Sequence, residues 1–132
     1  MSFDLGVWHS DGSVTDEEAG DLYTKLCEEK VVMTGESGAV EAFYHELTSH
    51  WPEIDTVPEE KIDDLDNCPW SCALDRSGMH VIMACVWPKA NEVAAFVYQL
   101  AMKHGLVLYN PQESTVYLPP KLKPQRSRFR FW

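Results

Sequence analysis

Two short stretches bring together side chains that could bind metal or do redox chemistry. The first is CPWSC, in which Cys68 and Cys72 flank Pro69, Trp70 and Ser71. Redox pairs and zinc knuckles separate their cysteines by two residues rather than three. In an extended strand the two Cα atoms would lie about 13 Å apart, at ~3.3 Å per residue, beyond the roughly 7 Å reach of a disulfide. We therefore expect a strand entrance, with Cys72 buried on the strand and Cys68 in the loop before it.

The second stretch, HELTSH, runs from His45 to His50 and resembles the zinc-protease pattern HExxH with one residue too many. Helical residues four apart point the same way, whereas residues five apart diverge by roughly 140°, so one metal ion cannot be held by both rings. The DDLDN run at 63–67 lacks the central glycine and closing glutamate of a calcium loop. Neither stretch predicts a metal site, and no Walker-type or GxGxxG motif predicts a cofactor.

His80 shares a predicted strand face with Ile82, Ala84 and Val86. A histidine on an apolar strand can act as a general base or a pH sensor. The alternative is a histidine at a strand end whose ring nitrogen bonds the adjoining loop, and His80 directly follows a DRSG turn. Both interpretations stay open from the sequence.

Apolar periodicity predicts the elements that would position these residues. Predicted strands lie at 2–8, on both sides of a turn at 75–78 and on both sides of a turn at 110–114, and predicted helices at about 15–27, 39–50 and 88–104. The order β-α-α-β-β-α-β-β contains the βαββαβ order of ferredoxin-like folds. We predict an α+β, ferredoxin-like-related domain at 1–118, with an antiparallel or mixed sheet and helices on one face, and a basic aromatic tail at 119–132.

Local signals mark the helix boundaries. Thr15 and Glu18 form a capping box at the start of the first helix. Pro52 ends the second helix, and Pro88 opens the third. Gly105 is suited to the left-handed conformation that closes the third helix.

Composition is that of one globular domain. The chain has 132 residues, of which 45% are hydrophobic and 24% charged, enough for one core. No apolar run approaches the ~18 residues of a membrane-spanning helix, so we expect no membrane partner. The first residues, MSFDLGVWHSDGS, lack the basic region of a signal peptide. These features predict a cytoplasmic protein with reduced cysteines.

Charge is divided unevenly along the chain. Residues 1–66 hold 18 acidic and 3 basic residues, whereas residues 67–132 hold 3 acidic and 8 basic residues. An acidic surface built from 16–66 would attract a basic protein partner, because complementary fields speed association. Asp63, Asp64 and Asp66 are the candidate binding residues in the most acidic loop.

The C-terminal tail mixes cations with aromatic rings, in the run from Arg128 to Trp132. Such a mixture could stack on nucleic acid bases or lie at a membrane surface. The acidic body would repel phosphates, so nucleic acid binding is expected through the tail alone or not at all. We expect the tail to dock instead on the acidic half of its own chain, or on a second copy through residues 121–132.

Four segments resemble a family of small uncharacterised proteins, mainly bacterial: SFDLGVW, WPEID, PWS and HGLVLYNPQ. The resemblance covers residues 2–118, implies a shared fold, and transfers no catalytic residues. If the segments are functional, strand ends would bring them together around a small pocket lined by Asp4, Trp8, Trp70, Tyr109 and Gln112. The alternative is that the aromatic residues are core and residues 110–112 form only a turn.

Two functions follow from these patterns. The first is a non-catalytic interaction protein, immunity-like by analogy with small acidic inhibitors, whose acidic surface engages a basic partner. The second is a small enzyme or ligand-binding protein with a pocket near Trp70, His80 and Tyr109. A deep polar pocket with a perturbed His80 would favour the second function. The sequence favours the first, with no cofactor.

Overall fold

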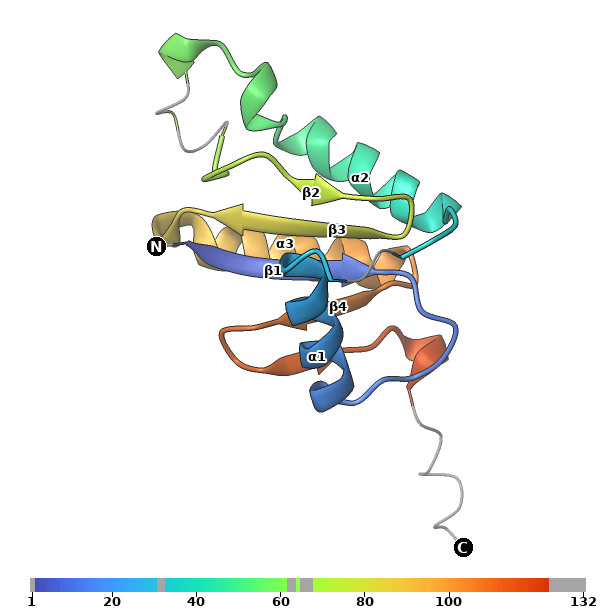
Figure 1. Cartoon of the computed structure of the whole chain (residues 1–132). Coiled ribbons are helices and arrows are strands. Elements are labelled where there is room, and N and C mark those ends of the chain that lie inside the picture. Colours follow the sequence, from blue (N-terminus) through green and yellow to red (C-terminus); the bar gives the residue numbers. More distant parts are fainter. Residues whose placement is uncertain (1, 31–32, 62–63, 65–67, 124–132) are drawn as a thin grey trace, which may run out of the picture.

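In the described part of the chain, five strands form one antiparallel sheet through the middle of the molecule (Figure 1). The computed structural model describes residues 2–30, 33–61, 64 and 68–123. The strands lie in the order β2-β3-β1-β4-β5, and they are β1 (Phe3–Trp8), β2 (Asp75–Arg76), β3 (His80–Cys85), β4 (Val107–Asn110) and β5 (Thr115–Tyr117). With the three α-helices of the same described residues, this sheet confirms the predicted α+β class.

Strand β1 is the centre of the sheet. It pairs along its whole length with β3, from Phe3 opposite Cys85 to Trp8 opposite His80, and its second half pairs with β4. Because side chains alternate along a strand, Phe3 points to one face and Trp8 to the other. Phe3, Leu5 and Val7 lie in the main core on one face, whereas on the other face Trp8 is buried and Asp4 is partly exposed.

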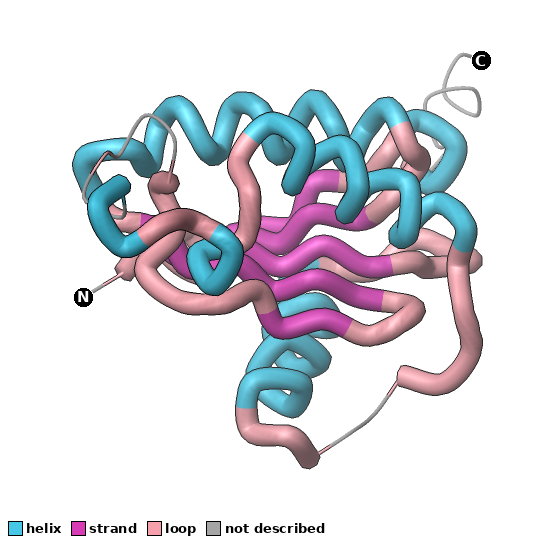
Figure 2. The backbone as a smooth tube through the Cα atoms, turned by 90° about the horizontal axis from the view of Figure 1, so that it is seen from above, coloured by secondary structure: helices cyan, strands magenta, loops and turns pink. Residues whose placement is uncertain are grey.

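The helices cover the two faces unequally. They are α1 (Asp16–Cys27), α2 (Gly38–His50) and α3 (Ala90–Lys103). Figure 2 shows α2 and α3 together on one face of the sheet and α1 on the other. The prediction that the helices lie on one face is therefore wrong for α1. The physical reason is that Trp8 and Tyr109 occupy the second face, and the apolar stripe of α1, which includes Ala19 and Leu26, buries them.

The connections pass over neighbouring strands. The chain goes from β1 through α1 and α2 to β2, and β3 lies between β1 and β2 in the sheet. It then goes from β3 through α3 to β4, and β1 lies between those strands. The ferredoxin-like assignment of this connectivity stays a prediction.

The predicted boundaries of the first two helices and the end of the third are confirmed, whereas α3 begins at Ala90 and Pro88 lies in the 3₁₀ turn Trp87–Lys89 that precedes it. Thr15 Oγ1 accepts the Glu18 amide at 3.0 Å while Glu18 Oε1 accepts the Thr15 amide at 2.9 Å. Helix α2 ends at His50, just before Trp51 and Pro52. After α3, Gly105 adopts a φ of +71°, which glycine tolerates without steric cost.

The CPWSC stretch differs from its prediction. Trp70 forms an isolated bridge with Cys85, and Asp75 is next to pair, opposite Ile82. Five residue steps separate Trp70 from Asp75 but only three separate their partners, so the intervening chain leaves the ladder. Cys72 is consequently exposed rather than buried, whereas Cys68 lies in the loop before the bridge, as predicted, and is buried there. All four cysteines are free thiols.

The histidines of HELTSH point to different neighbours. His45 lies 3.3 Å from Glu41, one helical turn earlier, and His50 stacks on Phe96 with ring centroids 4.4 Å apart. Among the residues that the structure describes, no group of three or more His, Cys, Asp or Glu side chains could hold a metal ion.

The start of the predicted tail packs on the domain. Pro119 is buried, and Leu122 packs against the cluster beneath α1. Residues 124–132, which carry most of the predicted docking function of the tail, lie outside the described residues. In the described ranges, no helix has the length and apolar character needed to cross a membrane.

Candidate functional site

The α1 side of the sheet is only half covered. Strand register places one row of side chains across this face, in the order Asp75, Ile82, Gly6, Tyr109 and Val116. Helix α1 lies over β4, β5 and part of β1, whereas no helix of the described residues lies over β2 and β3 on this side (Figure 1). The row therefore changes from a buried end to an open end at Gly6.

Two glycines hold α1 in its position. A Cβ on Gly6 of β1 would lie 2.9 Å from a ring carbon of Tyr23, and a Cβ on Gly20 of α1 would lie 2.8 Å from the Tyr109 hydroxyl. Each glycine thus receives the aromatic side chain of the opposing element. The two tyrosine rings meet between them, with centroids 5.5 Å apart. This interlock fixes the edge of α1 beside the open half.

We call the open half the acidic sheet face and define it by Asp4, Asp75, Ile82 and Ala84. Ile82 and Ala84 are partly buried and form an apolar floor, because their strand alternates with the core residues Val81 and Met83. Asp4 lies opposite Ala84 and Asp75 opposite Ile82, so a carboxylate flanks the floor on each side.

The two carboxylates have no cationic partner within the described residues. Asp4 accepts a hydrogen bond from the Ser2 hydroxyl at 2.7 Å, and Asp75 lies 3.8 Å from Nε2 of His80. Arg76 follows Asp75 directly but points to the other face, where its guanidinium stacks 3.8 Å above the Tyr44 ring. Alternation along β2 therefore separates Asp75 from the nearest arginine.

The negative field of this face acts on two thiols. Although the residue is exposed, partial desolvation of its thiol, followed by the charges of Asp4 and Asp75, raises the pKa of Cys72. Burial and the same two carboxylates also raise the pKa of Cys27, against a hydrogen bond from Tyr23 that lowers it. Because the thiolate is the nucleophile, both cysteines are poor candidates for covalent catalysis at neutral pH.

His80 lies at the end of the acidic sheet face. Its Nδ1 is 2.7 Å from the Ser77 hydroxyl, which also accepts the Met79 amide at 3.1 Å. This confirms the strand-end position bonded to the adjoining turn. Its Nε2 is buried and has no hydrogen-bond partner among the described residues, because Asp75 is too distant. Burial lowers the pKa of His80, against a smaller opposing effect of Asp75, so the ring is neutral at pH 7.

The residue types Ser77, His80 and Asp75 are those of a hydrolase triad, but their geometry is not. The serine hydroxyl is used within its own turn, and the carboxylate is 3.8 Å from the ring instead of within hydrogen-bond distance. The three residues belong to one short hairpin, and their contacts stabilise that hairpin. We therefore assign them no catalytic role.

A small groove adjoins His80 at the C-terminal end of α1. It has a volume of about 190 Å³, and Leu26, Glu29 and Met33 form its second wall. Glu29 has a φ of 57°, the conformation usually taken by glycine after a helix. A non-glycine residue there costs roughly 1–2 kcal/mol. Glu29 thus adds a third carboxylate beside the acidic sheet face despite backbone strain.

The predicted aromatic pocket is not formed. Trp8 and Tyr109 are buried under α1, with ring centroids 6.4 Å apart. Trp70 lies in the core on the opposite side, edge-on to Trp51, and donates its Nε1 hydrogen to the Trp51 carbonyl at 3.2 Å. His80 lies opposite Trp8 across β1 and β3, on the same face of the sheet as Trp8 and on the opposite face from Trp70. The three tryptophan and tyrosine side chains are core residues, as the alternative interpretation proposed.

Gln112 has a structural role that its segment did not reveal. Its side chain accepts the Asp4 amide at 2.8 Å and donates to the Asp4 carbonyl at 2.7 Å. Asn110 Oδ1 orients it by accepting a second Gln112 Nε2 hydrogen bond at 2.7 Å. The Gln112 amide therefore replaces a missing strand residue beside β1 and holds Asp4 at the acidic sheet face.

The acidic loop lies elsewhere. Residues 52–61 follow α2 at the β2 edge of the sheet, away from α1 (Figure 1). Asp64 is exposed, and its carbonyl accepts the Cys68 amide at 2.9 Å. Asp63 and Asp66 lie outside the described residues. The acidic residues of 16–66 are consequently divided between separate regions of the surface.

Comparisons of the chain with protein-family models, with curated proteins and with solved structures gave no match. The resemblance of its four segments to a bacterial family therefore stays a prediction, and the function must be argued from the geometry above.

Proposed function

We propose that this chain is a non-catalytic binding protein that receives a basic segment of a protein partner on the acidic sheet face. One observation carries the proposal: the apolar floor of Ile82 and Ala84 is flanked by the carboxylates of Asp4 and Asp75, which pair with no lysine or arginine of the described chain. A segment that alternates apolar and basic side chains would complement both features.

The charge distribution supports a cationic partner. The chain has a net charge of −10. Most lysine and arginine residues of the described chain are already neutralised beside carboxylates, namely Lys25 with Asp21, Lys30 with Glu28, Arg76 with Glu41, Lys89 with Glu92 and Lys103 with Glu46. The surplus negative charge would speed the approach of a basic protein and repel phosphate groups.

The local chemistry supports binding rather than catalysis. The thiols beside the face have raised pKa values, and the serine of the His80 turn is bonded to its own backbone. The pocket expected for the small-enzyme alternative would need Trp70 beside Tyr109, and the sheet separates these residues. The face offers shape and charge, which are sufficient for recognition of a protein surface.

The first experiment is affinity capture with the full chain as bait at low and high salt. We expect one basic protein to be retained at about 50 mM salt and lost at about 500 mM, because screening weakens charge attraction. The captured protein is then purified and its dissociation constant measured against salt. Retention that does not change with salt would contradict the proposal.

A second copy of the chain is the competing occupant, through its basic C-terminal residues. Light scattering at low salt distinguishes the two, with the full chain compared to a chain that ends at Lys123. We expect both proteins to be monomers. A full-length dimer that becomes a monomer after truncation would assign the face to the tail of a second copy and overturn the proposal of a foreign partner.

A further inference from the structure

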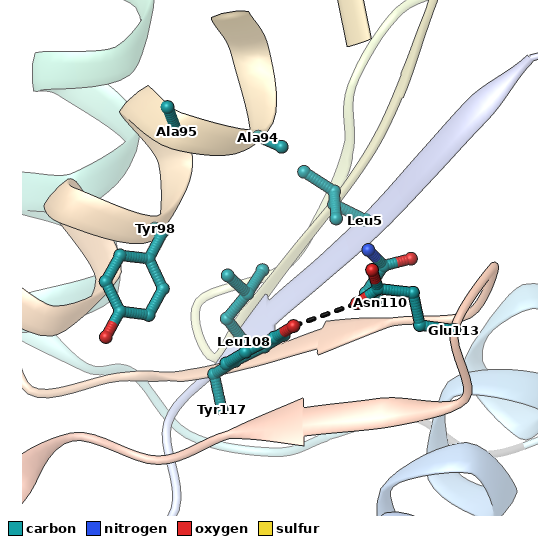
Figure 3. Close-up of a pocket in the computed structure, with 8 residues that line it drawn as sticks. All are labelled: Leu5, Ala94, Ala95, Tyr98, Leu108, Asn110, Glu113 and Tyr117. Carbon is teal, nitrogen blue, oxygen red and sulfur yellow. Dashed lines mark hydrogen bonds between the residues drawn. The ribbon is translucent and has the colours of Figure 1, made fainter. Parts of the chain in front are cut away.

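A separate cavity lies on the other side of the sheet, between α3 and the β4–β5 hairpin (Figure 3). Its volume is about 320 Å³, near the lower end of the ~300–1,000 Å³ typical of small-ligand sites. Leu5, Leu108 and Ala94 form an apolar floor. The cavity is independent of the acidic sheet face, which lies across the sheet from it.

One wall of the cavity carries a carboxylate. Glu113 Oε1 accepts the Tyr117 hydroxyl at 2.8 Å, and this hydrogen bond is the main reason that the pKa of Tyr117 is raised. No lysine or arginine of the described residues pairs with Glu113. Its second oxygen is therefore available to a cation, and an anionic ligand would be repelled.

A hydrogen-bond donor stands beside this carboxylate. Asn110 is only 8% exposed, and its Oδ1 accepts hydrogen bonds from the backbone amide and side chain of Gln112 at 3.0 and 2.7 Å. These bonds fix the orientation of the amide group, so that its nitrogen faces the cavity in Figure 3. No acceptor within the described chain takes the Nδ2 hydrogens, and this nitrogen is not among the fully buried unpaired atoms, so a ligand in the cavity can accept from it.

Two aromatic rings enclose the opening. Tyr98 of α3 and Tyr117 of β5 meet edge to face, with centroids 5.7 Å apart and planes at 84°. Tyr98 is 42% exposed, so part of its ring is open to solvent beside the cavity. A ring face beside a carboxylate favours an organic cation, through cation–π attraction.

We propose that this cavity binds a small organic amine: an ammonium group on Glu113, an oxygen acceptor on the adjacent carbon facing Asn110 Nδ2, and a compact apolar body on Leu5 and Leu108. The ammonium group would meet the second oxygen of Glu113, and the acceptor would meet the Asn110 Nδ2 hydrogens, while Leu5 and Leu108, only 2% and 3% exposed, form the base of the cavity. Neutral compounds of the same shape would lose the charged contact, and carboxylates would meet the Glu113 charge.

The test uses L-phenylalaninol as the probe, with 3-phenylpropan-1-ol as the uncharged comparator and 3-phenylpropanoate as the anionic one. Calorimetry gives the affinity, and amide chemical shifts locate the contact. We expect L-phenylalaninol to shift the signals of Ala94, Tyr98 and Leu108, and to bind at least about tenfold more tightly than either comparator, since a charge-assisted hydrogen bond is worth ~1.5–3 kcal/mol.

The variant Glu113→Gln keeps an acceptor for Tyr117 and removes the charge. We expect it to weaken L-phenylalaninol binding about tenfold and to leave 3-phenylpropan-1-ol unchanged. Glu92→Gln, which removes one charge from the exposed side of α3, is the matched control and should change neither. Equal affinities for the three probes, unchanged amine binding in Glu113→Gln, or shifts confined to other surfaces would each overturn the proposal.

Discussion

The two faces of the sheet solve the same burial problem differently. On one face, α2 and α3 close a core in which Phe43, Leu47 and Val97 have no measurable exposure, and the cavity beside Tyr98 lies at the β4–β5 edge of this face. On the other face, α1 closes only the β4–β5 half and leaves Ile82 and Ala84 as a partly exposed floor. A fold that already has a complete core can leave such a floor uncovered, and this comparison is the reason to place recognition on the α1 side.

The largest expected effect is on the closed face. Phe43→Ala should lower the free energy of unfolding by about 3–5 kcal/mol, because a fully buried ring leaves a cavity. Ile82→Ala on the open floor should cost only about 1 kcal/mol, because part of this side chain already contacts water. Denaturant unfolding measures both. Similar losses for the two variants would show that the open half is as tightly packed as the closed face.

The contact of Gly6 with the Tyr23 ring beneath α1 accounts for the second-largest expected loss of stability. Gly6→Ala should cost about 1–3 kcal/mol, since its Cβ would overlap the Tyr23 ring. Amide exchange should accelerate in α1 more than in α2. Gly12→Ala is the control, because a Cβ at Gly12 meets nothing within 4 Å. If Gly6→Ala exchanged like the control, α1 would not depend on this contact.

A substitution at Glu29 tests whether this residue strains the backbone at the wall of the groove beside His80. Glu29→Gly should raise the free energy of unfolding by up to about 1 kcal/mol, because glycine adopts a positive φ freely. Glu28→Gly, at a φ of −90°, should instead destabilise the helix end. A Glu29→Gly variant no more stable than wild type would remove the argument from strain.

The smallest effect concerns His80 and pH. Its folded-state pKa is lowered by burial, so the unfolded chain binds the proton more readily. Stability from this group is therefore complete above the unfolded pKa of about 6.5 and is lost as pH falls toward the folded value. We expect His80→Gln to flatten the slope of stability between pH 5.5 and 7.5, whereas the exposed His45→Gln leaves it intact. An unchanged slope in His80→Gln would show that the ring is not preferentially neutral in the folded state.

Local chemistry allowed much of this fold to be predicted. The capping pair Thr15–Glu18, the stop at Pro52 and the left-handed Gly105 are decided within a few residues of sequence. The α+β class followed from the order of these elements. The face chosen by α1 could not be read in the same way, because it depends on which side of β1 and β4 carries large aromatic rings.

The candidate site was harder to predict for the same reason. Asp4 reaches the acidic sheet face because Gln112, 108 residues later, bonds its backbone. Cys72 became exposed because the chain between Trp70 and Asp75 leaves the ladder, which no single-strand pattern shows. His80 was recognised from the sequence, yet its role emerged only from Ser77 and the buried Nε2. The clearest sequence signals for the packing of α1 on the sheet were Gly6 and Gly20, because a glycine inside a strand or helix can mark a close approach of another element.

The most direct measurement of the central claim is the affinity of the captured basic partner for two matched charge variants. Asp4→Asn with Asp75→Asn removes both carboxylates of the acidic sheet face, and Glu59→Gln with Glu60→Gln removes the same charge from the region beyond α2. We expect the first pair to weaken binding at least about tenfold and the second to change it less than about twofold. Equal losses would show that net charge alone attracts the partner, and a loss confined to the second pair would move the binding surface to the acidic loop.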